Sequence, residues 1–262
     1  MTFSPAGMIE PIRVFIGYDP KEAVAYHVCC NSIITRATRP VQIYPLALNL
    51  FASEYTEGHE DGSNEFVYSR FLVPWLCHWS GWAIYLDGDM LVRNDIAELW
   101  DRRRGDMGVQ VVKHDYKTKH PVKYFGAKNE DYPRKNWSSM ILWNCAYFPN
   151  RRLTPHYVSQ AMGAHLHRFA WLKDEQIDAV PPTWNHLVGE YEHEPEAKLL
   201  HFTVAIPALE GYENQEGADE WRGELAKAME PIGNEHGDRN SSSAGNGSRE
   251  LASPIRSVLA HS

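Results

Sequence analysis

Short apolar runs alternate with helix signals along most of the chain. Runs rich in β-branched and aromatic residues, of the kind buried in parallel sheets, predict strands over 12–19, 41–46, 82–87, 107–112, 139–144 and 197–202. Asp19 followed by Pro20 is a typical helix start and predicts a helix that ends near residue 35. Asp95 in the same way caps a short helix over 96–100.

Two longer segments have the spacing of helices. Large apolar side chains recur every four residues from Val67 to Trp79, which predicts one helix over 65–79 with a kink at Pro74. A further helix is predicted over 154–170. Strands that alternate with helices predict an α/β fold with a mostly parallel central sheet flanked by helices, in which ligands bind beyond the carboxyl ends of the strands.

Length and charge narrow the classes of protein. With 262 residues and 43% hydrophobic content, the chain is expected to form one domain over 1–232, followed by a Gly-, Ser- and Asn-rich tail over 233–262 that is predicted to be disordered. The net charge of −8 argues against a protein that binds nucleic acid by neutralising phosphates, so no nucleic-acid partner is expected.

Cysteine content and hydropathy indicate the compartment. The four cysteines form no CxxC pair, so neither a zinc site nor a disulfide framework is indicated, and reduced thiols in a cytoplasmic protein are expected. The start of the chain lacks the pattern of a signal peptide, and no run of eighteen apolar residues predicts a membrane span.

The strand over 82–87 ends in two carboxylates, Asp87 and Asp89. Two ionised carboxylates about 4 Å apart repel by roughly 4 kcal/mol at an effective dielectric constant near 20, so bringing them together requires a cation or a shared proton. Oxygen ligands suit Mg²⁺ or Mn²⁺, and such an ion can also bind a diphosphate. The alternative is a solvated turn in which the side chains diverge, but a pair between an apolar strand and a short helix favours a metal site.

Several motifs resemble those of GT-A fold glycosyltransferases, specifically glycosyltransferase family 8. The pattern of that family is a strand ending in Y-L-D-x-D before a short D-I-x-x-L helix, and this chain reads IYLDGDMLVRNDIAEL. The resemblance extends from about Ile12 to Leu225. It includes YSRF around Arg70, DEQ at 174–176, PTWN at 182–185 and LLHFT at 199–203.

The resemblance implies a metal centre. Asp87 and Asp89 would bind Mn²⁺ or Mg²⁺, and His201 would be the third protein ligand, which favours manganese because imidazole suits it better. Arg70 would help to hold the sugar and the acidic motif. Because Arg70 interrupts an apolar helix, we expect a carboxylate partner for it, either Asp87 or Asp174.

The resemblance also implies a pocket for a nucleotide sugar. The residues expected to bind this donor are Gly17, Tyr18, Asp19, Asp87, Ser138, Ser139 and Asn185. Among them, Tyr18 or a neighbour would stack on the base and Asp87 would lie near the ribose, whereas the competing interpretation of Asp19 is a helix cap alone. Asp174, Glu175 and Gln176, together with Arg70, are the catalytic candidates, and the DEQ segment would lie beneath the sugar to position it or to stabilise an oxocarbenium-like centre.

The expected reaction is the transfer of a sugar, with retention of configuration, from a nucleotide-sugar donor to a hydroxyl acceptor. The enzyme would be a metal-dependent glycosyltransferase of the hexosyltransferase type, with a UDP-sugar as the favoured donor. Two segments depart from the family. Trp137, Ser138 and Ser139 stand where the family usually has N-[AS]-G before an apolar strand. Val204, Ala205 and Ile206 follow His201 where a Gly-rich loop, often with a Lys, reaches the diphosphate. The second departure raises the alternative of a nucleotide-sugar-binding protein without catalytic activity.

A haloacid-dehalogenase-type phosphatase is a further alternative, because its first Asp of a D-x-D pair acts as a nucleophile. DGDMLV fits that motif superficially. The chain has no convincing match to the Ser or Thr strand end, the Lys and the later acidic pair of that class, which disfavours this alternative.

Overall fold

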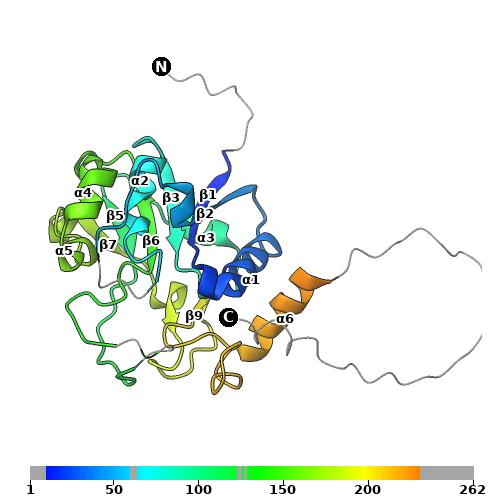
Figure 1. Ribbon diagram of the computed structural model, residues 1–262. Helices are drawn as coiled ribbons and strands as arrows, with labels where there is room; N and C mark the ends of the chain where they lie inside the picture. The colour runs from blue at the N-terminus through cyan, green and yellow to red at the C-terminus, as the bar shows by residue number, and fades with distance from the viewer. Residues whose placement is uncertain (1–9, 60–63, 123–125, 127–128, 231–262) are drawn as a thin grey trace, which may run out of the picture. The chain divides into compact units, whose positions relative to one another are not determined.

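The structure is a computed structural model that describes residues 10–59, 64–122, 126 and 129–230 (Figure 1). Its central sheet has six strands in the order β2-β1-β3-β6-β5-β7. Their bounds are β1 Ile12–Gly17, β2 Val41–Leu46, β3 Trp82–Leu86, β5 Val109–Val111, β6 Met140–Asn144 and β7 Ile177–Ala179. β6 is antiparallel to β3 and β5, whereas the other neighbouring strands are parallel. The predicted α/β fold with a mostly parallel sheet is confirmed.

A second sheet of three short strands, in the order β4-β9-β8, was not expected from the sequence. Its strands are β4 Met90–Val92, β8 His186–Leu187 and β9 Leu199–His201. β4 pairs antiparallel with β9 in a register that sets Met90 opposite His201. Because β4 begins directly after Asp89, this pairing brings the late strand to the end of β3.

Helices cover both faces of the central sheet. Their bounds are α1 Ala23–Ile34, α2 Val73–Leu76, α3 Ile96–Trp100, α4 Pro155–Gln160, α5 Gly163–His167 and α6 Ala218–Met229. One core cluster joins the sheet to α4 and α5, and a second joins its other face to α1 and α3. Figure 1 shows α4 and α5 on the side of the sheet opposite α1.

The segment 65–79 is not the single helix that its periodicity predicts. A 3₁₀ turn, η3 (Ser69–Leu72), leads into α2, which is only four residues long. Pro74 lies in the first turn of α2, where its missing N–H breaks no helical hydrogen bond, so no kink is needed. The prediction was wrong because apolar side chains at helical spacing are buried here by a 3₁₀ turn and a short helix in succession.

The predicted helix over 154–170 is also wrong in extent, because the segment forms two short helices. Ala161 is the C-cap of α4 and Met162 is the N-cap of α5. Their ψ angles of 139° and 137° interrupt the helical backbone. Gly163, a poor helix former, follows directly at the break. The apolar spacing continues through the break and therefore concealed it.

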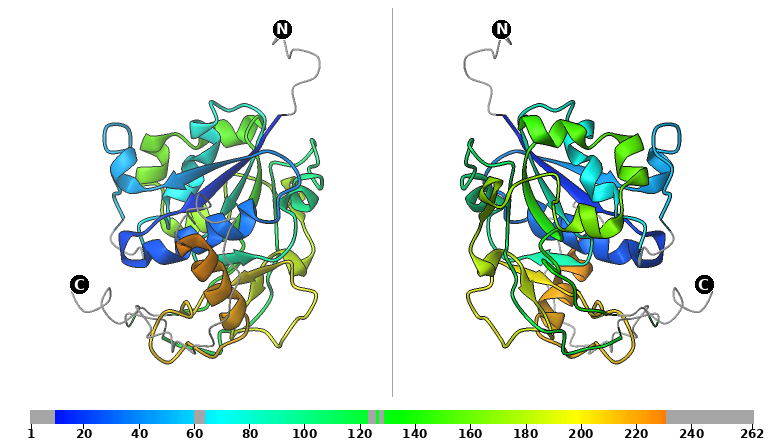
Figure 2. Two further views of the ribbon diagram at one scale, coloured as in Figure 1. Left: turned by 90° about the vertical axis from the view of Figure 1, so that its right-hand side faces the viewer. Right: turned by 90° about the vertical axis from the view of Figure 1, so that its left-hand side faces the viewer.

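Helix α6 was not predicted from the sequence, but it is anchored firmly to the rest of the fold. Trp221 is fully buried in a cluster with α1 and β9, and the Glu224 carboxylate accepts a hydrogen bond of 2.7 Å from Asn31 of α1. α6 therefore lies beside α1, as both views of Figure 2 show. The predicted disordered tail, 233–262, falls outside the described residues. Within the described ranges, no helix is both long and apolar enough to cross a membrane.

Candidate active site

The two carboxylates of the D-x-D pair and one imidazole meet where the two sheets adjoin. Asp87 follows β3, Asp89 precedes β4 and His201 ends β9. Their candidate ligand atoms all lie within 4.8 Å of one another. The backbone fixes this arrangement, because the Asp87 N–H donates to the Ser139 carbonyl and the Phe202 N–H donates to the Asp89 carbonyl.

Distances within this group suit a shared cation. Nε2 of His201 lies 3.3 Å from Oδ1 of Asp89 and 3.8 Å from Oδ2 of Asp87. The three side chains are largely buried. Two carboxylates and one imidazole form a donor set that Mn²⁺ accepts, so the residues present fit the expected metal.

A hydrogen-bond relay behind His201 sets the orientation of its ring. Nδ1 of His201 contacts Oδ1 of Asn185 at 3.1 Å, and Nδ2 of Asn185 donates to Oγ of Ser139 at 2.8 Å. An amide oxygen can only accept, so Nδ1 carries a proton and Nε2 is the ring nitrogen that faces the carboxylates. A hydrogen bond from Nδ1 to a protein oxygen is typical of histidines that bind a metal through Nε2. Asn185 and Ser139, expected to contact the donor, instead support a metal ligand, and their contact with a donor stays a prediction.

Arg70 is buried beside the acidic pair. Its guanidinium forms an ion pair of 2.9 Å with Oδ1 of Asp87 and donates to the carbonyl oxygen of Ser138 at 2.9 Å. Nε of Arg70 donates to the carbonyl of Phe66 at 3.3 Å. Of the two expected partners, Asp87 is therefore the one found, whereas Asp174 pairs with Arg134.

Neighbouring groups act on the pKa of Asp87 in opposite directions. Burial raises the pKa of Asp87 above its ordinary value, the charge of Arg70 opposes that shift, and the charge of Asp89 adds to it. The phenol of Tyr85 donates to Oδ1 of Asp87 at 2.6 Å, which also favours the ionised form. A divalent cation between Asp87 and Asp89 would favour the charged form of both carboxylates.

The residues expected to contact the nucleotide lie at the end of β1, next to β3. A Cβ on Gly17 would lie 2.4 Å from the ring of Phe66, so only glycine fits there. Asp19 is buried and accepts hydrogen bonds from the N–H groups of Lys21 and Glu65, which confirms its capping interpretation. Tyr18 packs edge-on against Tyr26, with ring centroids 5.4 Å apart. Their role in donor binding stays a prediction.

The DEQ segment does not lie at the group formed by Asp87, Asp89 and His201, which we call the metal group. Asp174–Gln176 form a 3₁₀ turn, η6, that precedes β7, and the Gly108 N–H donates to the carbonyl of Gln176. Since β7 runs in the same direction as β3, this turn lies at the amino end of the strands, whereas Asp87 follows the carboxyl end. Glu175 pairs with Lys173, and Oε1 of Gln176 accepts from the Lys173 N–H. Their predicted role beneath the sugar has no support in this arrangement.

His114, which no sequence motif singled out, follows β5 at the same end of the sheet as Asp87. It is 7% exposed, and its Nδ1 lies 2.9 Å from the hydroxyl of Tyr191. Nε2 of His114 has no hydrogen-bond partner among the residues that the structure describes. Burial, together with the nearby His201 and His186, lowers the pKa of His114 to about 3, so the ring is neutral at physiological pH.

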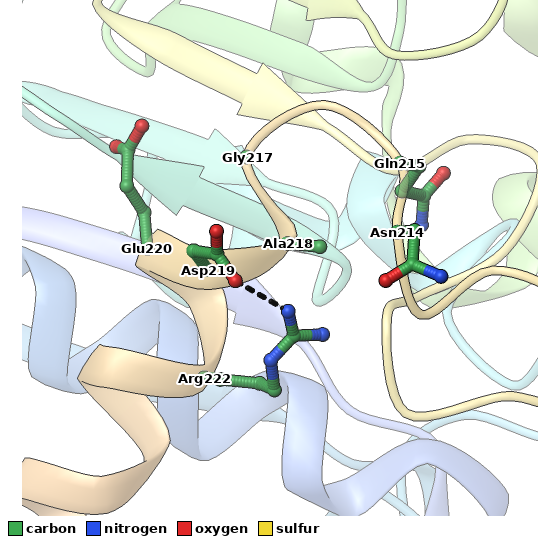
Figure 3. A pocket seen from close by; sticks show the side chains of 7 residues that line it. All are labelled: Asn214, Gln215, Gly217, Ala218, Asp219, Glu220 and Arg222. Carbon is green, nitrogen blue, oxygen red and sulfur yellow. Dashed lines mark hydrogen bonds and ion pairs between the residues drawn. The ribbon is translucent and has the colours of Figure 1, made fainter.

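The surface of the described residues includes two small pockets. One, of about 320 Å³, is lined by residues 114–117 and 131–135. The other, of about 240 Å³, lies at the first turn of α6, where Asp219 pairs with Arg222 at 2.5 Å (Figure 3). No residue predicted to bind metal or donor lines either pocket, but His114 lines the first.

Comparison with curated proteins identifies a sequence relative of this chain. No protein-family model matches the chain. Protein CDI of Arabidopsis thaliana is 41% identical over 224 residues, which cover 82% of this chain and 86% of that protein. Such identity over most of both chains indicates common descent and a shared fold.

Solved structures similar to this chain are glycosyltransferases. The bifunctional glycosyltransferase WbbM has a TM-score of 0.59 at 16% identity over 86% of this chain, and GlyE of Streptococcus pneumoniae TIGR4 has 0.53 at 15% over 82%. This chain spans about half of WbbM (51%) and 60% of GlyE. The galactosyltransferase LgtC, solved with donor and acceptor sugar analogues, has a TM-score of 0.52 at 13% identity, covering 84% of this chain and 97% of LgtC. At such low identity the likeness establishes the GT-A fold.

Proposed function

The chain belongs to the same family as Protein CDI of Arabidopsis thaliana, and from its fold and its metal-binding group we propose that it is a metal-dependent glycosyltransferase. The donor is a nucleotide sugar, with a UDP-sugar favoured, and the acceptor is a hydroxyl group. Transfer proceeds with retention of configuration, as in the family 8 enzymes that the sequence resembles, and the sugar transferred is a hexose.

One observation carries this proposal: Asp87, Asp89 and His201 converge from two sheets, and a relay through Asn185 turns Nε2 of His201 toward the carboxylates. A structural role alone would not require three ionisable side chains within 4.8 Å of one another at the carboxyl end of a strand. Ligands of open α/β sheets bind at that end. The fold shared with LgtC and GlyE supports transfer of a sugar rather than phosphatase chemistry.

Each residue has a defined task in the proposed reaction. A bound Mn²⁺ or Mg²⁺, held by Asp87, Asp89 and His201, would stabilise the negative charge that develops on the departing diphosphate. Arg70 holds Asp87 in place through its ion pair and carries positive charge into the buried site. Asn185 fixes the tautomer of His201.

A nucleotide-sugar-binding protein without turnover is the second candidate, favoured by the segment after His201. Val204, Ala205 and Ile206 are buried, and Ile206 packs in the cluster formed with α6. Where the family has a flexible Gly-rich loop over the diphosphate, this chain therefore has a segment that is packed into a core. Such a segment lacks the backbone freedom that glycine provides for a close approach to phosphate.

Titration calorimetry of UDP into the metal-free protein, with and without Mn²⁺, tests the proposal. We expect binding that requires Mn²⁺ and that is lost in Asp89→Asn, which keeps the shape of the side chain and removes a charged ligand. Asp101→Asn, in an exposed ion pair with Arg39, is the matched control and should bind UDP normally. Absence of UDP binding to the wild type at every metal concentration would contradict both candidate functions.

Turnover separates the two candidates. Release of UDP from a panel of UDP-hexoses, with water or simple glycosides as acceptors, is expected for the glycosyltransferase. Metal-dependent UDP binding without turnover of any donor and acceptor pair would favour the binding protein.

The state of the cysteines supports the cytoplasm as the site of action. All four cysteines are free, which suits a reducing compartment.

A further inference from the structure

The lining of the pocket at residues 114–117 and 131–135 includes a residue with a buried, unsatisfied polar atom. That residue is His114, whose Nε2 has no hydrogen-bond partner in the described part of the chain. A buried imidazole nitrogen without a partner costs free energy, since its hydration is lost and nothing replaces it. A ligand hydroxyl would satisfy this atom.

We propose that this pocket binds a neutral sugar ring and that Nε2 of His114 forms a hydrogen bond with one of its hydroxyl groups. The inference rests on the proposed function and deepens it by assigning where a reacting sugar is held. A hydroxyl group suits a neutral imidazole because it can donate to, or accept from, Nε2 in either tautomer.

The charges around the pocket nearly balance, which favours a neutral ligand over an ion: Asp115 and Asp131 line it together with Lys117, Arg134 and Lys135. Asp131 accepts from the N–H and the hydroxyl of Thr118, and Arg134 pairs with Asp174. Nζ of Lys135 donates to Thr118, Asn129 and the carbonyl of Glu130. These side chains shape the pocket and leave little net charge to attract a phosphate or a carboxylate.

Aromatic side chains supply the apolar part of the pocket. Tyr116 and Tyr132 both line it, and Tyr132 is 40% exposed. The hydroxyl of Tyr116 accepts a hydrogen bond of 2.8 Å from Asn136, which fixes its ring. Rigid aromatic surfaces combined with a few placed polar groups are typical of pockets for small polar molecules.

The pocket and the metal group share their supporting residues. Asn136 holds Tyr116 through its amide, and its carbonyl accepts from Oγ of Ser139, the residue that also holds Asn185 behind His201. On the other side, Tyr132 lies close enough to Arg70 and Asp87 for their charges to act on its hydroxyl. A sugar in the pocket would therefore lie beside the metal group.

The sugar could come from the donor or from the acceptor, and ligand binding to matched variants distinguishes the two. His114→Asn keeps a polar group near Nδ1, where it can still meet Tyr191, but removes Nε2. His114→Gln places its amide near the position of Nε2 instead. Tyr132→Ala, at an exposed position, is a second pocket variant, and His165→Asn, on α5, is the control.

The ligands are UDP, UDP-glucose and UDP-galactose, measured by calorimetry, and methyl glucoside and methyl galactoside, measured by saturation-transfer NMR, all with Mg²⁺. If the pocket holds the donor sugar, we expect His114→Asn and Tyr132→Ala to weaken binding of a UDP-sugar about fivefold or more while UDP binds as before. If it holds the acceptor, the methyl glycoside signal falls instead. His114→Gln should stay closer to the wild type, and His165→Asn should match it.

Failure of this inference differs from failure of the proposed function. If the wild type binds UDP-sugars or glycosides, and both His114→Asn and Tyr132→Ala bind them equally well, the inference is overturned. The glycosyltransferase proposal then stays intact. Loss of UDP binding by the wild type would contradict the proposed function, and the glycoside signal would then decide the inference alone. A glycoside signal that depends on His114 supports it, and the absence of any such signal overturns it.

Discussion

At the scale of single residues, the ion pair between Arg70 and Asp87 is the interaction on which the site depends most. Both side chains are buried, and each is the main charge partner of the other. Removing one partner from a buried ion pair leaves an uncompensated charge, which typically costs 3–5 kcal/mol. We therefore expect Arg70→Met to lower the free energy of unfolding by about 3 kcal/mol in urea titrations with EDTA at neutral pH.

The double variant Arg70→Met with Asp87→Asn should recover part of that loss, because it removes the stranded charge as well. Arg93→Met provides the matched surface control, since Arg93 pairs with the half-exposed Glu220, and should cost less than about 1 kcal/mol. Equal losses for the buried and the surface variant would contradict a special role for Arg70.

His114 gives the protein a sensitivity to acid. The pKa of His114 is lowered to about 3 in the folded protein and returns to about 6.5 on unfolding, so below pH 6.5 the unfolded chain binds the extra proton and stability falls as pH falls. Between pH 7 and pH 5 this amounts to about 2 kcal/mol. Urea unfolding at pH 7 and pH 5 with EDTA should show that the wild type loses about that much more than His114→Asn, and parallel losses would contradict it.

At the scale of elements, the start of α6 is held against β9 by one glycine. Gly217 has a φ of +73°, and a Cβ there would lie 2.2 Å from Cδ1 of Leu200, the neighbour of His201. We expect Gly217→Ala to destabilise the protein by about 1–3 kcal/mol, because its positive φ strains an alanine and the buried Leu200 side chain must move. A displaced Leu200 side chain next to His201 should also weaken Mn²⁺ binding. Thermal unfolding and Mn²⁺ titration measure the two effects.

Gly223, inside the same helix, is the natural control. A Cβ there meets nothing within 4 Å, so Gly223→Ala should raise stability by about 0.5–1 kcal/mol through helix propensity and leave Mn²⁺ affinity unchanged. A loss of Mn²⁺ affinity in this variant would show that α6 as a whole, rather than the contact at Gly217, controls the site.

The sequence predicts strands better than helices in this protein, for a physical reason. The long strands carry continuous apolar runs, because both faces of the central sheet are covered by helices, and runs such as 82–86 are unambiguous. Helical spacing at 65–79 is equally clear, yet tertiary packing divides that segment between η3 and α2. β8 and β4, of two and three residues, left no pattern that predicted them, whereas the three-residue strands β5 and β9 lie within longer apolar runs and were predicted.

The structure brings together the three residues predicted as metal ligands, and it shows supporting contacts that the sequence did not predict. Asp87, Asp89 and His201 were found because each occupies a recognisable motif, and the structure brings them together. Asn185 was expected at the donor, but it orients His201, a contact across sixteen positions of sequence that no local pattern encodes. His114 belongs to no sequence motif. Only the fold reveals that its Nε2 is buried without a hydrogen-bond partner in the described residues.

At the scale of the whole molecule, the metal group joins the two sheets. Asp87 belongs to the end of the central sheet, whereas His201 belongs to the small sheet. A bound ion should therefore link the small sheet to the central sheet. Because the ion binds only the folded state, its binding should stabilise the two sheets in this arrangement. We expect Mn²⁺ to slow hydrogen exchange of the backbone amides in β9, measured by mass spectrometry.

The exchange of β2, an edge strand of the central sheet that pairs with β1, should not change with Mn²⁺. Asp89→Asn should remove the effect on β9. Slower exchange throughout the molecule, or slower exchange that persists in Asp89→Asn, would indicate binding elsewhere.

The pairing of Met90 with His201 has a consequence for how this site can be altered or lost. Side chains alternate between the two faces of a strand, so a shift of the ladder by one residue would turn the imidazole away and present Leu200 to the carboxylates. A single-residue insertion or deletion within β9, between Leu199 and His201, would therefore abolish metal binding while every ligand remains in the sequence. Among homologues, spacing in this segment is thus as informative about retained chemistry as the identity of the ligands themselves.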